Sequence, residues 1–525
     1  MGQMHFDVPK SAVEFLRDCD WANAYLCGIE GVPWQTRNAL KNHRLTLTRS
    51  VDTSAKLFMT CVVPEIGQRL LTTCTLRCGE TPHRLLIELA RGSCYRVRIQ
   101  ADTWQRGGLS LNDRFDALLK NGTGQFLDAV QGFRQSGPTD AVTQSAIASI
   151  TTLEQAADEL GQLFASQSIA FRRSRENRFS TMLAVGVRPP EPATIAHLKT
   201  ASIAGSSRSS NDDPQVSMQP VLDCFNAAAV RVTWTAVETG SGRFDFEAVG
   251  KSIDACVAKS LKVIAGPLIS YHESGLPSWL SLMEDDFEKL VTTMIQFVEA
   301  TVTQLRGRVQ LWNAASGLNT VGPLRLDDEQ IMRMSIAVLQ TIRRIDPNTP
   351  VIMSLDQPCG EYLSKDQNGI SPLHFADALL RSGLGLAGIG LNFRFGHPDG
   401  STFPRSSVEF AQLIDRWATL GTPLLVQLSV PGRANPHGDT PHGSRRLAHQ
   451  LHPHLNGDSA DWAEFQNQFT KPLVDTLLAK QVVHAIVWEH WSDEPEPSSA
   501  GLLDANGQPR PVVRYLAKIR DELLM

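Results

Sequence analysis

Three carboxylate side chains could act as a catalytic acid or nucleophile. Asp356 and Glu361 lie at the end of one short apolar run and just beyond it, and Glu489 follows another. Two carboxyl groups facing each other across a cleft can act together in hydrolysis, one as general acid and the other as base or nucleophile. The alternative is structural, because an aspartate in a polar loop commonly caps a turn. These three residues are therefore candidates for catalytic acids.

Such residues need a scaffold, and from about residue 180 the chain alternates strand-like and helix-like patterns. Amphipathic stretches such as 286–305 and 407–420 separate eight apolar runs of strand length. The runs are Thr181–Val187, Ala227–Trp234, Leu261–Ile269, Val309–Asn313, Val351–Leu355, Leu386–Phe393, Leu424–Val430 and Val482–Trp488. This alternation predicts a (β/α)8 TIM barrel of the α/β class over residues 179–525, with its functional groups at the C-terminal ends of the strands.

Two other patterns precede the predicted barrel. Residues 1–108 contain short apolar or alternating runs between turn residues, which predict a β-sandwich-like accessory domain. The strands expected there are 45–49, 56–63, 85–89 and 95–99. Residues 109–178 carry apolar side chains at helical spacing and predict a helical connector between the two domains.

The barrel region also carries a family resemblance. The segments Val232–Glu238, Gly242–Phe246, Tyr271-His272 and Leu276–Trp279, with the closing segment 501–511, resemble the endo-1,4-β-xylanases of glycoside hydrolase family 10. The resemblance covers about residues 220–520. It implies a barrel, a β-glycan or oligosaccharide ligand, and O-glycosyl hydrolase chemistry with two catalytic glutamates.

Both glutamate positions implied by the resemblance hold other residues. Gly317 occupies the acid/base position after strand 4, and Gln427 occupies the nucleophile position of strand 7. A neutral amide cannot serve as the carboxylate nucleophile of a retaining mechanism. The sequence therefore names Asp356, Glu361 and Glu489 as the alternatives through which catalysis could still proceed.

The resemblance also implies a set of residues that contact the carbohydrate. Trp488 is expected to close over the sugar, and Tyr271 and His272 are expected to touch it. The remaining expected contacts are Asn392, Arg394, Gln427 and Asn319.

These observations favour a family 10-like barrel protein of carbohydrate metabolism that binds a β-glycan or oligosaccharide, with lost or non-standard hydrolase activity. Two alternatives stay open. One is an active xylanase-like endo-β-glycanase with relocated carboxylates, and the other is a non-enzymatic scaffold protein.

Composition excludes other classes of partner. The net charge of −5, without a basic stripe, argues against nucleic acid, and no apolar run has the length of a membrane span. The nine scattered cysteines and the histidine-rich segment 437–454 fit no common metal-ligand spacing, so neither a metal nor a cofactor is expected. The N-terminus does not read as a secretory signal, so a cytoplasmic location is expected, with export by another route as the alternative.

Overall fold

The computed structural model describes most of the chain, over residues 2–16, 21, 23–189, 221–240, 242–272, 274–365, 369–396, 401–433, 459–493 and 499–525.

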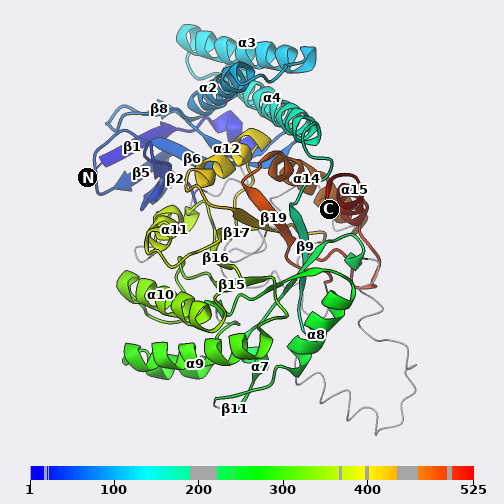
Figure 1. Ribbon diagram of the computed structural model, residues 1–525. Helices are drawn as coiled ribbons and strands as arrows, with labels where there is room; N and C mark the ends of the chain where they lie inside the picture. The colour runs from blue at the N-terminus through cyan, green and yellow to red at the C-terminus, as the bar shows by residue number, and fades with distance from the viewer. Residues whose placement is uncertain are drawn as a thin grey trace, which may run out of the picture.

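A closed parallel barrel forms the C-terminal part of the molecule (Figure 1). Its third strand is split into two short pieces, β13 and β14, and the ring closes where β13 and β14 pair with β15. In chain order the strands are β9 (Met182–Val187), β10 (Ala227–Val230), β13 (Lys262–Ala265) with β14 (Ile269–Ser270), β15 (Leu311–Ser316), β16 (Val351–Asp356), β17 (Gly388–Arg394), β18 (Leu424–Ser429) and β19 (Val483–Trp488). The predicted (β/α)8 barrel is confirmed, with a strand at each of the predicted runs.

Helices surround the barrel, and local sequence signals explain where two of them start. Asp327 and Gln330 form a capping box at the first turn of α10 (Asp328–Ile345), and Ser406 and Glu409 form another at α12 (Ser407–Ala418). The other barrel helices are α8 (Glu247–Ala258), α9 (Phe287–Leu305), α11 (Pro372–Arg381), α14 (Ser459–Ala479) and α15 (Pro511–Leu523), with the one-turn α7 (Trp234–Val237) after β10. None of the described helices is long and apolar enough to cross a bilayer.

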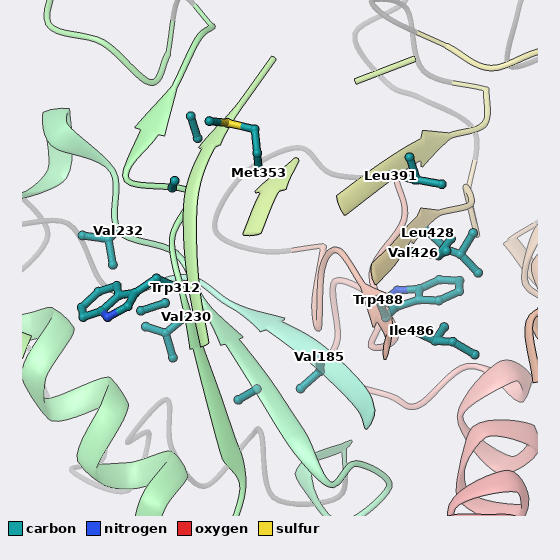
Figure 2. Packing of buried hydrophobic residues seen from close by; sticks show 14 of the residues in the cluster. Val185, Val230, Val232, Trp312, Met353, Leu391, Val426, Leu428, Ile486 and Trp488 are labelled. Carbon is teal, nitrogen blue, oxygen red and sulfur yellow. The ribbon is translucent and has the colours of Figure 1, made fainter. Parts of the chain in front are cut away.

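Alternation along the strands separates two sets of side chains. One set packs with helix residues in the large apolar cluster outside the barrel, and Figure 2 shows Val185, Val230, Val426 and Trp488 among its members. The other set fills the barrel interior with small and branched residues. This inner set comprises Met182, Ala184, Ala227, Ala229, Ile264, Leu311, Ile352, Leu425, Ala485 and Val487. Successive side chains of a strand point to opposite faces, so this parity also tells which residues at the strand ends face the lumen.

The N-terminal part contains two four-stranded sheets that share an apolar core. In sheet order, the first sheet is β4 (Arg37–Lys41), β5 (Arg44–Arg49), β1 (Gly2–Asp7) and β8 (His83–Arg84). The second is β3 (Pro33–Trp34), β2 (Tyr25–Cys27), β6 (Lys56–Val63) and β7 (Gly67–Thr72).

The prediction of strands at 85–89 and 95–99 was wrong, because both runs lie in helix α2 (Leu85–Arg106). The buried Leu85, Leu89 and Val97 recur at helical spacing and pack on the sheets and on neighbouring helices. Helices α3 (Asp113–Ser136) and α4 (Asp140–Arg173) follow.

Helix α4 joins the helical layer to the barrel. Its Asp158 accepts a hydrogen bond from the backbone nitrogen of Ser407 in α12, at 3.1 Å. Arg172, near its end, donates to the carbonyl of Leu478 in α14, at 2.6 Å. These contacts fix the N-terminal part against the α12 and α14 side of the barrel (Figure 1).

Candidate functional site at the barrel mouth

Polar and charged side chains gather at the C-terminal ends of the barrel strands. By the parity of their strands they face the lumen. We call this set the mouth residues: Arg188, Arg231, Asp356, Asn392, Arg394, Gln427 and Glu489. Functional groups of TIM barrels occur at this end, so these residues define the candidate site.

Asp356 is the centre of a hydrogen-bond network. Its Oδ1 accepts from the Ser316 hydroxyl at 2.8 Å and from the Asn392 amide at 2.6 Å. Its Oδ2 lies 2.7 Å from Nε2 of His272, whose side chain is 36% exposed while that of Asp356 is 10% exposed. Asn392 also donates to the Ser316 hydroxyl, at 2.9 Å. The carboxylate therefore orients an imidazole that reaches solvent, an arrangement suited to proton transfer or to binding a hydroxyl group.

The pKa of Asp356 shows which protonation state this network favours. Burial is the largest influence and acts to raise the pKa, but the hydrogen bond and charge of His272, with Arg394 and Asn392, outweigh it and lower the pKa below its ordinary value. Asp356 is therefore ionised at neutral pH. It cannot supply the proton that a general acid must deliver to a leaving group.

Gly317 leaves room for the His272 imidazole beside Asp356. Its backbone has a φ of +82°, and a Cβ built on it would lie 3.1 Å from both Cε1 and Nε2 of His272. A glutamate here would meet the His272 ring and would strain the backbone. His272 thus lies beside the backbone position from which any side chain at residue 317 would project.

Glu489 is held by an ion pair. Its two carboxylate oxygens accept from Nε and Nη2 of Arg394, at 3.1 and 2.5 Å. Such two-point pairing stabilises the ionised carboxylate. Gln427 lies between these groups in the sheet, because its Cα pairs with Asn392 on one side and with Val487 on the other.

His490, the residue after Glu489, makes stability depend on pH. Burial lowers its pKa most, and Arg394, Arg188 and Arg231 lower it further against the opposing effect of Glu489, giving a value of about 4. The unfolded chain, with an ordinary histidine pKa, binds a proton between about pH 6.5 and 4 that the folded chain does not, so stability is lost as pH falls through that range.

We expect His490 to lower the free energy of unfolding by about 2 kcal/mol when the pH falls from 7 to 5. In denaturant unfolding, the His490→Gln variant should therefore lose about 2 kcal/mol less stability than the parent over the same pH range. His484→Gln, which changes an exposed histidine of the same strand, should behave as the parent. Parallel pH profiles for His490→Gln and the parent would contradict this origin of the pH dependence.

Three predicted ligand contacts are buried. Trp488 lies on the outer side of β19 (Figure 2), is 2% exposed, and donates from Nε1 to the Ala500 carbonyl. Tyr271 is 1% exposed and donates its hydroxyl to the Leu324 carbonyl. Asn319 is fully buried and bonds both the carbonyl and the backbone nitrogen of Asp356. Neither aromatic ring has an exposed face on which a sugar could stack, which argues against the stacking expected of Trp488. Asn319 connects the loops after β15 and β16 through its hydrogen bonds.

Glu361 lies away from the mouth, between the barrel and the N-terminal sheets. It pairs with Arg405 at 2.7 Å and accepts from the backbone nitrogen of Phe403. Burial raises its pKa above the ordinary value despite Arg405, and its charge also acts on Tyr25 of strand β2. The structure places Glu361 in a buried ion pair with Arg405, and its catalytic role stays a prediction.

Sequence reasoning placed no function on Arg188 and Arg231. Each directly follows a barrel strand, and counting in steps of two from the inner residues Ala184 and Ala227 reaches them. Strand alternation was therefore the signal that could have found them.

The histidine-rich segment 437–454 lies outside the described residues.

Comparison with known proteins gives matches among solved structures. No family model matches the chain, and no curated protein matches it. Among solved structures, xylanase 10B from Thermotoga maritima is 14% identical, with a TM-score of 0.45 over 68% of this chain and 97% of that chain. Xylanase 10C from Cellvibrio japonicus is 14% identical, with a TM-score of 0.47 over 66% of this chain and 71% of that chain.

A third similar structure is xylanase 10B from Thermotoga petrophila RKU-1 in complex with xylobiose. It is 15% identical, with a TM-score of 0.45 over 66% of this chain and 96% of that chain. The chain is similar to these xylanases, and its own strand order and pairing establish the barrel.

Proposed function

We propose that the barrel mouth binds a β-linked oligosaccharide or glycan and does not hydrolyse it by the retaining mechanism of two carboxylates. The sequence motifs of strands 2, 3 and 8 and the closing segment support a carbohydrate ligand, as does the xylobiose in a similar solved structure. The alternatives, an active glycanase with relocated acids and a scaffold, make different predictions for the same experiments.

The observation that carries the proposal is the chemistry of the mouth. Amide, guanidinium, imidazole and carboxylate groups from several strands converge on the lumen, with His272 and Arg394 partly exposed. A few converging polar groups that fix orientation are typical of small-molecule sites, and the hydroxyl groups of a sugar need such partners. A purely structural barrel would not need an exposed imidazole held by a buried carboxylate.

The state of the carboxylates opposes retaining hydrolysis. Such an enzyme needs a free carboxylate nucleophile and a protonated acid, with carboxyl groups about 5–5.5 Å apart. Among the mouth residues, Asp356 is ionised and bonded to three side chains, and Glu489 is paired with Arg394. Gln427 and Gly317 contribute no acid.

Calorimetric titration with xylohexaose, cellohexaose and mannohexaose tests the binding. We expect saturable binding of at least one of them, weakened about tenfold in Gln427→Ala, which removes a partly exposed amide that could bond a hydroxyl group. The matched control is Gln304→Ala, an exposed glutamine in α9 on the outside of the barrel. If no glycan binds, the proposal fails and the scaffold alternative gains support.

A further inference from the structure

The mouth carries more positive than negative charge among its described residues. Arg188, Arg231 and Arg394 each add a guanidinium, while Asp356 and Glu489 add the carboxylates. A neutral saccharide needs hydrogen-bond partners but no such excess of cationic groups.

Backbone geometry brings two of these arginines together. Arg188 follows β9 and Arg231 follows β10, adjacent parallel strands, and the backbone nitrogen of Arg231 donates to the Val187 carbonyl at 2.9 Å. Both side chains fall on the lumen side, in phase with Ala184 and Ala229.

Arg394, the third arginine, is connected to the end of β9 through its ion pair with Glu489. A Cβ at Gly186 would collide with the backbone of Glu489, so the start of the loop after β19 lies against the end of β9. Glu489 in turn holds Arg394 of β17 by the two-point ion pair. Arg188, Arg231 and Arg394 therefore surround one corner of the mouth, and we call them the mouth arginines.

Neighbouring groups respond to this charge. After burial, which acts most strongly, all three mouth arginines help lower the pKa of His490, and Arg394 also helps lower that of Asp356. A positive potential at the site produces both effects. Guanidinium groups bind carboxylates and other oxyanions through paired N–H donors.

We propose that the mouth arginines select a saccharide that carries an oxyanion, either a uronate carboxylate or a sulfate ester. The inference rests on the proposed function, because it specifies the class of ligand for the same site. It assigns binding roles to Arg188 and Arg231, with Arg394 held in position by Glu489.

Titration calorimetry at low salt compares three ligands of equal length: xylotetraose, xylotetraose bearing a glucuronic acid branch, and sulfated xylotetraose. We expect at least one acidic ligand to bind about tenfold more tightly than the neutral one. Added salt should weaken the acidic ligand and leave the neutral one nearly unchanged, since screening acts on the charge–charge contribution. Comparing the two acidic ligands identifies which oxyanion the site prefers.

Substitution of the arginines tests whether they cause the preference for acidic ligands. Arg188→Gln and Arg231→Gln should each remove most of the difference between acidic and neutral ligands. Arg306→Gln should keep it, because Arg306 is exposed at the end of α9, before β15 and so at the opposite end of the barrel. If a variant fails to fold, the salt dependence of the parent protein still decides.

The outcomes separate the two proposals. Equal or weaker binding of both acidic ligands would overturn the inference and leave saccharide binding intact. Binding of none of the three, together with the hexaoses, would overturn both.

Discussion

Asp356→Ala is expected to destabilise the protein by about 3 kcal/mol and to abolish glycan binding. The substitution leaves buried hydrogen-bond donors without an acceptor and removes the carboxylate that orients His272. The carboxylate accepts hydrogen bonds from Ser316 and Asn392 and pairs with His272, and alanine leaves these groups without their acceptor. Denaturant unfolding gives the loss of stability, and calorimetry gives the loss of binding.

Two further variants sharpen this prediction. Asp356→Asn keeps one acceptor oxygen and removes the charge, so it should fall between the parent and the alanine variant. Asp285→Ala changes an exposed aspartate before α9 and should leave both readouts near the parent. An Asp356→Ala protein with parent-like stability and affinity would show that the network is incidental.

Arg405→Leu is expected to cost about 3–5 kcal/mol of unfolding free energy, because it leaves the Glu361 carboxylate buried without its partner. Glu361 is 5% exposed and Arg405 is 12% exposed, so solvent cannot replace the lost ion pair. The double variant Glu361→Leu/Arg405→Leu should recover much of the loss, since an apolar pair of similar volume needs no compensating charge. Urea unfolding of the two single variants and the double variant measures this coupling.

The same variants separate a structural Glu361 from a catalytic one. Glu361 lies between the barrel and the N-terminal sheets, where Thr36 also donates from its backbone nitrogen to the Ser364 carbonyl. Glycan affinity of the folded double variant should therefore match that of the parent. A double variant that is stable but has lost binding or turnover would return Glu361 to the functional site.

The barrel was predictable because each strand is an apolar run bounded by helical periodicity. Short apolar runs are ambiguous in isolation, and this explains the error at 85–89 and 95–99: such a run packs equally well as one side of a helix. The surrounding sequence decides, and here the apolar spacing from Leu85 to Ala101 continues as a single helical face.

The site was predictable in part. The absence of acids at Gly317 and Gln427 could be read directly from the sequence. The pairing of His272 with Asp356 could not, because the two residues follow different strands and only the geometry of the closed barrel brings them together. The outward position of Trp488 and the lumen position of Arg188 both follow from strand alternation, which the motif comparison did not apply.

One titration tests the central claim most directly. Xylohexaose, or whichever hexaose binds best, is titrated into the protein to saturation, and the same sample is then incubated and separated by chromatography. The account predicts a saturable heat of binding at one site per chain and recovery of the intact hexaose. Release of shorter oligosaccharides at a rate that Asp356→Asn or Glu489→Gln abolishes would contradict it, and so would the absence of any binding heat.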